Sequence, residues 1–383
     1  MIFSVALLLY LVFFDTENLL IFAGQPRIII AGGKGVGKST FLRYLINRIL
    51  DEIGPLVVID LDPGQAEFTL PGCISAVRIA SPVLGPNFTN QQRSKTLCLN
   101  LGDVNVSNIS RRFSQQMARL VKRAQDHPDL NKLPWVVNTM GFNRGLGVKL
   151  IGEVVSNVNP STMIEIRSRF EGKNYNINFD KLTGDKCNLL QFEAVPEDSK
   201  NMGSNDLWGI PEPAKLRDIV ILSYFAHLYR GDSSKFLQGV KPFKVSWSDV
   251  HVQVLHSPDI KIAQVPALLN MSLVSLGILQ DPQLVSEEGL VSPEASVDIV
   301  GFGFVRGVDV GQKLFYVVTP LRLDELKQVN CLSVGAVGLP KGIILSQKKT
   351  QNKVPYRSDP SKQTIPLAQP WQRYSKPKNF DSK

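Results

Sequence analysis

A glycine-rich segment directly after a short apolar run constrains this chain more than any other feature. Residues 27–31 read RIIIA and lead into GGKGVGKST at residues 32–40, a match to G-x-x-x-x-G-K-S/T, and a segment with helical spacing follows. Strand, glycine loop and helix in this order form a P-loop, whose backbone N–H groups surround a phosphate. The chain is therefore predicted to bind a nucleotide, with Lys38 on the β- and γ-phosphates and the Ser39 hydroxyl on Mg²⁺.

Short apolar strands alternate with amphipathic helices through the first half of the chain. This alternation predicts an α/β fold of the P-loop NTPase type, with a doubly wound parallel sheet. Ligands of such sheets bind at the carboxyl ends of the strands. Residues 175–205 are polar and predicted to be irregular. The expected elements are strands at 27–31, 56–59, 96–101, 134–138 and 162–166, and helices at 39–50, 110–124, 145–155 and 216–228.

From residue 240 the pattern changes to valine-rich alternating stretches at 243–247, 250–255, 295–305 and 313–318. Period-two alternation broken by glycine and proline predicts a smaller, mostly β C-terminal domain. The domain prediction is an apolar N-terminal segment at 1–26, a P-loop domain at 27–235, a β-rich domain at 236–345 and a basic, partly disordered tail at 346–383.

Composition narrows the class of protein. The chain has 383 residues, of which 43% are hydrophobic, so a sizeable core is expected. Its four cysteines are scattered and its four histidines lack metal-ligand spacing, which argues against a disulfide framework or a zinc site. The apolar run at 2–14 is too short to span a bilayer, so no membrane partner is expected. It is interpreted as the remnant of a missing N-terminal region rather than an export signal.

The net charge of +9 is concentrated at the C-terminal end. Residues 346–383 hold nine Lys/Arg and two Asp/Glu, with aromatic residues interleaved. A basic tail of this kind suits a polyanion or an acidic protein groove. The alternative is a solvated tail with no specific partner.

Asp60 and Asp62 end the second predicted strand, where P-loop enzymes carry a metal-binding carboxylate. One carboxylate there can hold Mg²⁺. A second one, two residues on and on the same face of the strand, can accept a proton from a hydroxyl acceptor. The Gln65 amide follows in a tight turn and is able to orient a phosphate or a water.

Two further positions are candidates at the edge of the predicted cleft. Thr139 and Phe142 follow the strand at 134–138, and Phe142 offers a ring on which a base can stack. Phe142 is equally compatible with a place in the core. Arg217 begins the helix at 216–228 and is either a lid residue that supplies charge in the transition state or a solvated arginine.

Three segments together resemble one kinase family. They are GGKGVGKSTFLRYLINRIL at 32–50, VIDLDPGQAEFTLP at 58–71 and WVVNTMGFNRGLG at 135–147. They are similar to the polynucleotide 5′-hydroxyl kinases of the pre-ribosomal-RNA processing type. Residues 216–225 resemble the lid of that family and residues 243–254 the start of its C-terminal β domain. The similarity covers about residues 27–345.

The resemblance implies roles for individual residues. Asp62 matches the residue that activates the RNA 5′-hydroxyl, Asp60 supports the metal, and Gln65 lies beside them. Thr139 and Phe142 match a clasp for the terminal nucleotide, and Arg217 matches a lid arginine. The residues implied to bind the phosphates of ATP are Gly32, Gly33, Lys34, Gly35, Val36, Gly37, Lys38, Ser39 and Thr40.

The resemblance also implies a cellular role. The family acts in the nucleus, in the nucleolus, beside a HEPN-type endoribonuclease that leaves RNA with a 5′-hydroxyl end, and its C-terminal tail reaches that nuclease. Relatives carry an N-terminal β domain that helps hold adenine, whereas only 26 residues precede the first predicted strand here.

The expected function is ATP- and Mg²⁺-dependent phosphorylation of RNA 5′-hydroxyl ends in processing of the ribosomal RNA internal spacer. Two alternatives remain open. One is a P-loop ATPase or GTPase switch, although the N-K-x-D base reader of GTPases is lacking at residues 138–141. The other is a scaffold that activates an endoribonuclease without phosphorylating RNA.

Overall fold

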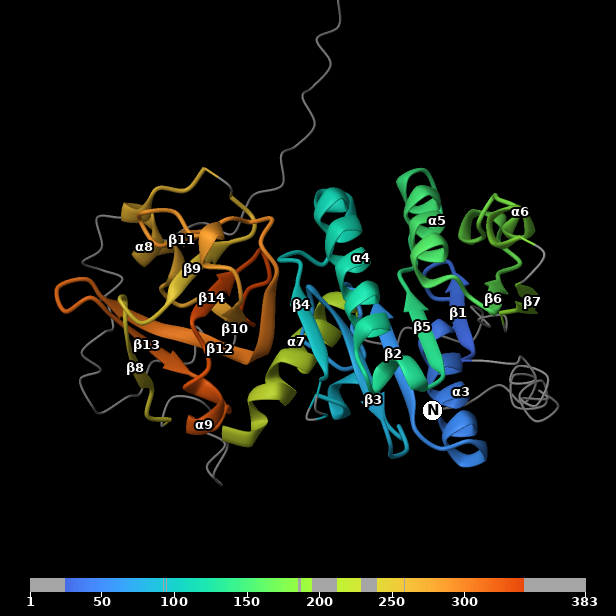
Figure 1. Cartoon of the computed structure of the whole chain (residues 1–383), viewed down its shortest axis with the longest axis horizontal. Coiled ribbons are helices and arrows are strands. Elements are labelled where there is room, and N and C mark those ends of the chain that lie inside the picture. Colours follow the sequence, from blue (N-terminus) through green and yellow to red (C-terminus); the bar gives the residue numbers. More distant parts are fainter. Residues whose placement is uncertain are drawn as a thin grey trace, which may run out of the picture.

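The computed structural model describes residues 25–340 apart from 92, 94, 185–186, 195–211, 229–239 and 258. The predicted tail at 346–383 and nearly all of the N-terminal segment at 1–26 lie outside the described residues. Two seven-stranded sheets dominate the described part. One sheet carries helices on both faces, and the other forms a mostly β lobe beside it (Figure 1).

The first sheet has the strand order β4-β3-β2-β5-β1-β6-β7. Its central strands are short runs of valine and isoleucine, typical of strands covered on both faces. The bounds are Arg27–Gly32 (β1), Leu56–Leu61 (β2), Cys73–Ile79 (β3), Leu97–Asn100 (β4), Trp135–Thr139 (β5), Thr162–Arg167 (β6) and Asn188–Glu193 (β7).

The predicted α/β fold with a doubly wound sheet is confirmed, and the one departure is that part of the sheet is antiparallel. β2, β5, β1, β6 and β7 run parallel, but β3 pairs antiparallel with both β2 and β4. The connection from β2 to β3 contains no helix. A parallel neighbour needs a crossover of about a dozen residues or more, usually helical, so β3 returns in the opposite direction.

The prediction that residues 175–205 are irregular was wrong for part of that segment. It contains α6 (Phe179–Thr183) and the edge strand β7. None of the residues of β7 is fully buried. A half-exposed edge strand carries polar residues and lacks a clear apolar pattern, so the sequence signal is weak.

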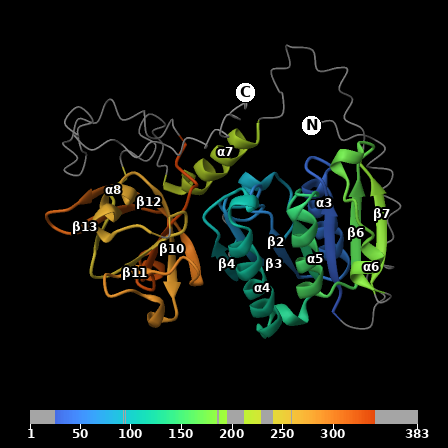
Figure 2. The same cartoon turned by 90° about the horizontal axis from the view of Figure 1, so that it is seen from above.

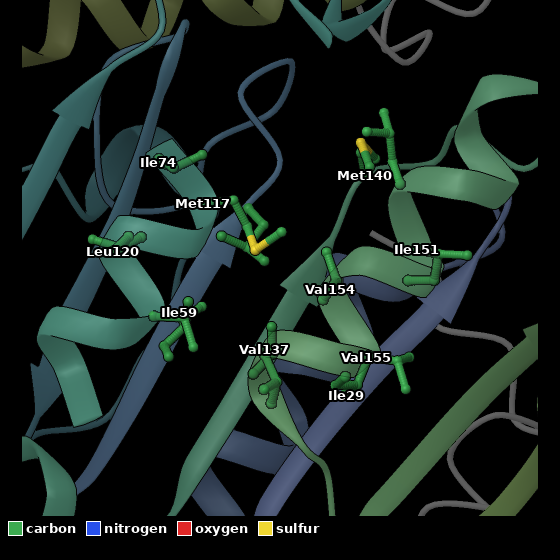
Figure 3. Packing of buried hydrophobic residues seen from close by; sticks show 14 of the residues in the cluster. Ile29, Ile59, Ile74, Met117, Leu120, Val137, Met140, Ile151, Val154 and Val155 are labelled. Carbon is green, nitrogen blue, oxygen red and sulfur yellow. The ribbon is translucent and has the colours of Figure 1, made fainter. Parts of the chain in front are cut away.

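Successive side chains of each central strand point to opposite faces of the sheet. Ile28 and Ile30 of β1 pack with α3, whereas Ile29 packs with α4 and α5. Figure 3 shows Met117 of α4 and Val154 of α5 above Ile59 and Val137 of the sheet. The longer helices of this lobe are α3 (Lys38–Glu52), α4 (Ser110–Asp126), α5 (Leu146–Val158) and α7 (Pro213–Phe225). Among the described helices, none has the length and apolar character that crossing a membrane requires.

The second sheet has the order β11-β9-β14-β10-β12-β13-β8. β8, β9 and β13 lie within strands expected from the sequence, and β12 overlaps the expected stretch at 295–305 but continues to Asp309, whereas β10, β11 and β14 were not expected. Two short helices, α8 (Val265–Leu269) and α9 (Leu323–Leu326), belong to this lobe. The strand bounds are Phe243–Ser246 (β8), His251–Val254 (β9), Leu273–Leu279 (β10), Leu290–Val291 (β11), Val297–Asp309 (β12), Leu314–Val318 (β13) and Cys331–Val334 (β14).

The two lobes share a core. α7 lies between the sheets (Figure 2), and its buried residues join one cluster with Leu70 and Cys73 of the first lobe and Phe302 of the second. The buried hydroxyl of Tyr224 on α7 accepts a hydrogen bond of 2.8 Å from the Phe302 backbone N–H. Arg123 of α4 also forms a two-pronged ion pair with Asp298 of β12. Packing and polar contacts therefore fix the second sheet against the first.

Tyr224→Phe tests the contribution of the Tyr224–Phe302 hydrogen bond to the packing of the two lobes. The substitution keeps the aromatic ring but leaves the buried Phe302 N–H without its acceptor, which costs about 1–3 kcal/mol. We expect the urea midpoint of unfolding to fall accordingly while the far-ultraviolet circular dichroism spectrum of the native state stays the same. An unchanged midpoint would show that this hydrogen bond does not hold the lobes together.

Candidate functional site

Three loops meet at one edge of the first sheet because β2, β5 and β1 are parallel neighbours. The P-loop leaves β1, the segment from Asp62 leaves β2, and the segment from Met140 leaves β5. The carboxyl ends of parallel strands lie at the same edge. The convergence expected from the sequence is thus present in the fold.

The P-loop adopts the curled backbone that its glycines allow. Gly37 has φ of 99°, a left-handed conformation that favours glycine, and it directly precedes the first residue of α3. The N-terminus of this helix therefore faces the loop, with its free N–H groups available to an anion. Ser39 and Thr40 follow in the first turn and are both partly exposed.

Lys38 lies folded against its own loop. Its Nζ donates hydrogen bonds to the carbonyl oxygens of Gly32 and Gly33 at 2.9 and 2.8 Å. Burial lowers the pKa of Lys38 to about 8, and the negative charge of Asp62 acts in the opposite direction. The ammonium group is thus already desolvated where a phosphate would meet it.

Asp60 is fully buried and heavily hydrogen-bonded. Its Oδ2 accepts from the Glu67 N–H at 2.6 Å, and its Oδ1 accepts from Asn138 Nδ2 at 2.9 Å and from the Asp62 N–H at 3.3 Å. Burial raises the pKa of Asp60 to about 7, although these donors favour the ionised form. Both of its carboxylate oxygens therefore take part in holding the loop after β2.

Asp62 is partly exposed and lies within the electrostatic reach of Lys38. Its Oδ1 accepts from the N–H groups of Gly64 and Gln65 at 2.9 and 3.1 Å, which closes the tight turn. Burial raises the pKa of Asp62, and the charge of Lys38 is the largest influence that lowers it. Among the described residues, no hydrogen bond engages its other oxygen, Oδ2.

Glu67 is a supporting residue that the sequence analysis did not single out. Its buried carboxylate forms a two-pronged pair with Arg43 of α3 at 2.9 and 2.8 Å, and it accepts from Asn90 at 2.8 Å. Because α3 begins in the P-loop, this pair ties the loop after β2 to the phosphate-binding helix. The available signals in the sequence were an acidic residue in the Asp60–Phe68 run and an arginine as the sixth residue of the helix that follows the P-loop.

The candidate substrate residues have different environments. Gln65 is partly exposed next to Asp62. Thr139 is fully buried, and its hydroxyl donates to the Ile30 carbonyl at 2.7 Å. It therefore joins β5 to β1 instead of presenting its hydroxyl to the cleft, because the strand geometry turns it inward. Phe142 is half-buried and packs against the core.

Arg217 lies in the second turn of α7 and is half-exposed. Among the described residues, it makes no hydrogen bond or ion pair with Lys38, Asp62 or the P-loop backbone. Its predicted role as a lid residue stays a prediction.

Gly141 is a second supporting residue at this edge of the sheet. A Cβ atom on Gly141 would lie 2.8 Å from the Cα and 2.9 Å from the N of Lys34. The backbone after β5 therefore packs directly on the backbone of the P-loop, as close as glycine permits. This contact sets the distance between the P-loop and Phe142.

The donor set at this edge fits Mg²⁺. Mg²⁺ is usually held by one or two carboxylates together with waters and phosphate oxygens rather than by an all-protein cage. Ser39 offers a partly exposed hydroxyl, Asp62 an oxygen without a hydrogen bond in the described part, and Asp60 a carboxylate nearby. Within the described ranges, no group of three or more His, Cys, Asp or Glu gathers as a cage.

Comparison with known families identifies both lobes. The model described as "mRNA cleavage and polyadenylation factor CLP1 P-loop" matches residues 32–227, just over half of the chain, and the model "NOL9-like, C-terminal domain" matches residues 238–340. Among solved structures, complexes of Clp1p with Pcf11p align at TM-scores of 0.61 and 0.60, with 15% and 16% identity, over 88% of this chain and 80% of theirs. At such identities the likeness concerns the fold.

Similar proteins occur in animals and plants under the name polynucleotide 5′-hydroxyl-kinase NOL9. The Bos taurus protein is 29% identical over 86% of this chain and 52% of its own length, and the Homo sapiens protein is 29% identical over 87% and 52%. The Arabidopsis thaliana protein is 28% identical over 82% of this chain and 87% of its own length. The chain thus spans about half the length of the mammalian relatives.

Gly141→Ala tests the contact between the two loops. The added methyl group would displace the backbone of Lys34, so we expect affinity for a fluorescent ATP analogue to fall at least about tenfold, equivalent to about 1.4 kcal/mol. The matched control is Gly152→Ala on α5, where the nearest atom to the new Cβ is 3.9 Å away. An alanine in a helix interior is favourable by up to about 1 kcal/mol, so this control should bind nucleotide normally. Equal affinity of the two variants would contradict the predicted role of Gly141.

Proposed function

Because the chain belongs to the CLP1 P-loop family, we propose that it is an ATP-dependent polynucleotide 5′-hydroxyl kinase. The observation that carries this proposal is that Lys38 and Asp62 lie within electrostatic reach of each other at the same edge of the first sheet. The buried ammonium group of Lys38 and the carboxylate of Asp62, the first residue after β2, influence each other's pKa across the end of β5. The names of the relatives with 28–29% identity agree with this activity.

The proposed reaction is an in-line transfer. The 5′-oxygen of the acceptor forms a bond to the γ-phosphorus of ATP while the bond to the β–γ bridging oxygen breaks and ADP leaves. The proton of the 5′-hydroxyl passes to Asp62, whose pKa is raised by burial and therefore lies closer to that of an effective base. Lys38 stabilises the charge on the transferred group.

Other residues have positioning roles in this proposal. The P-loop residues 32–40 hold the phosphates, and Mg²⁺, held by Ser39 with Asp60 or Asp62, would neutralise charge on the phosphate oxygens. Gln65 orients the acceptor, Phe142 stacks on the terminal base, and Arg217 adds positive charge from α7. Thr139 supports the clasp from within the sheet through its bond to Ile30.

We further propose a role in ribosomal RNA precursor processing, in the nucleolus, with RNA as the substrate. The support is the resemblance of the Asp60–Phe68 run and of the segment around Phe142 to kinases of that type. A HEPN-type endoribonuclease is the proposed partner, contacted through the basic tail, which lies outside the described residues.

Lys38→Ala is the first test. Removal of the ammonium group eliminates the main positive side chain on the transferred phosphate, and loss of one such group costs about 10²–10³ in rate or more. We expect transfer of labelled γ-phosphate from ATP to a 5′-hydroxyl oligonucleotide to disappear while the protein stays folded. Lys132→Ala, which removes the same charge at the opposite edge of the sheet, is the control. Normal labelling by the Lys38 variant would refute the kinase proposal.

Asp62→Asn separates binding from chemistry. Asparagine keeps an oxygen that accepts from Gly64 and Gln65 but cannot take up the acceptor proton. The transfer rate should fall by about 10²–10⁴-fold, with affinity for ATP little changed. If the rate of ATP hydrolysis changes neither with this substitution nor on addition of 5′-hydroxyl ends, the protein is an ATPase switch instead.

A further inference from the structure

The turn that follows β6 lies against the P-loop. β6 is the parallel neighbour of β1 on the side opposite β5 (Figures 1 and 2), so its carboxyl end reaches the same edge of the sheet. A Cβ on Gly33 would lie 2.0 Å from the Lys173 carbonyl oxygen, and one on Gly35 would lie 3.9 Å from Lys173 Nζ. Both the backbone and the ammonium group of Lys173 are therefore adjacent to the phosphate loop.

The same turn is fastened to the loop that carries Phe142. Asn143 Nδ2 donates to the carbonyl oxygens of Gly172 and Asn174 at 3.1 and 2.7 Å. A Cβ on Gly172 would lie 2.9 Å from Arg144 Nη2. The loop after β5 and the turn after β6 thus form one continuous surface beside the P-loop.

This surface presents an exposed aromatic ring among cations. Phe170 is 56% exposed, with the Arg169 guanidinium 5.0 Å and the Lys173 ammonium 5.9 Å from its ring centroid. We call Arg144, Arg169, Phe170 and Lys173 the β6-turn surface. Within the described part, its three cations form no ion pairs, and Glu171 in the same turn is not paired with them.

In the proposed reaction the phosphates of ATP already have partners, namely the N–H groups of the P-loop, Lys38, Mg²⁺ and Arg217. The charges of the β6-turn surface are additional to these. An acceptor with a 5′-hydroxyl end has no phosphate at its terminus, and its first phosphate lies on the 3′ side of its first nucleotide. Cations that grip such an acceptor must therefore lie away from the reacting hydroxyl, and an exposed ring beside them can stack a base.

We propose that the β6-turn surface binds the acceptor strand on the 3′ side of its terminal nucleotide. Phe170 stacks a base of the strand, and Arg144, Arg169 and Lys173 contact its backbone phosphates. The assignment rests on the proposed kinase function, because it extends the acceptor site that begins at Asp62 and Phe142. It makes the enzyme selective for polynucleotides over single nucleotides.

Two variants of the full chain test the proposal by direct binding. The probe is a fluorescent single-stranded 5′-hydroxyl RNA oligonucleotide, whose affinity is measured by anisotropy at several salt concentrations. Phe170→Ala should weaken binding about tenfold, because stacking contributes about 1–3 kcal/mol per base. Arg169→Ala/Lys173→Ala should lower the slope of log K against log salt by about 1.4, since each phosphate contact on a single strand contributes about 0.7.

Matched controls distinguish a local site from general charge. Lys122→Ala/Lys132→Ala removes two exposed positive charges, and Lys132 precedes β5 at the opposite edge of the sheet. Phe243→Ala removes an exposed ring from β8 in the other lobe. Neither control should change the oligonucleotide affinity as the test variants do. Equal effects of test and control variants, or a loss of ATP-analogue affinity with intact oligonucleotide binding, would overturn the proposal.

Transfer assays separate this inference from the proposed function. Failure of the wild-type protein to phosphorylate any 5′-hydroxyl end would refute the kinase, whatever the binding data. If wild type transfers phosphate and the variants show an unchanged KM for oligonucleotides, the β6-turn surface is refuted and the kinase stands. We expect the KM for an oligonucleotide to rise about tenfold in Phe170→Ala, with a smaller effect on a nucleoside 3′-monophosphate.

Discussion

The burial of opposite charges at the edge of the first sheet is the constraint on which this structure depends. Lys38 is only 7% exposed, and desolvation lowers its pKa to about 8. Such a charge is tolerated because Gly32 and Gly33 accept its hydrogen bonds and Asp62 attracts it. An uncompensated buried charge would cost several kcal/mol, so the ends of β1 and β2 have to be held at fixed positions. The same desolvation strengthens the interaction of Lys38 with a phosphate.

β5 holds those positions from the centre. Asn138 donates to Asp60 at the end of β2, and Thr139 donates to Ile30 of β1. Gly141 then packs on Lys34, while Glu67 and Arg43 tie the loop after β2 to α3. Asn138, Thr139 and Glu67 are buried, and each makes a hydrogen bond, as expected of buried polar side chains. The residues proposed for chemistry, Lys38 and Asp62, are thus surrounded by others that set their geometry.

The sequence predicted secondary structure best where a local apolar pattern matched the burial of the element in the fold. The P-loop was recognisable from its glycine pattern. Apolar spacing predicted the helices α3, α4 and α5, each of which buries one face, and the strands β1, β2, β5 and β6, which are buried almost entirely. β3 and β7 were not among the predicted strands. The antiparallel direction of β3 depends on which strands are its neighbours, which the local pattern does not reveal. β7 at the edge lacks the apolar pattern of a buried strand.

By itself, the sequence determined the phosphate loop, the run from Asp60 to Phe68 and the alternation that brings their ends to one edge. These features are local, since residue type and spacing over a few turns decide them. Tertiary structure decided that Thr139 points into the sheet, that Gly141 abuts Lys34, and that the turn bearing Phe170 and Lys173 lies beside the P-loop. Such contacts join residues far apart in the chain. They follow from strand order and close packing, which no short stretch of sequence encodes.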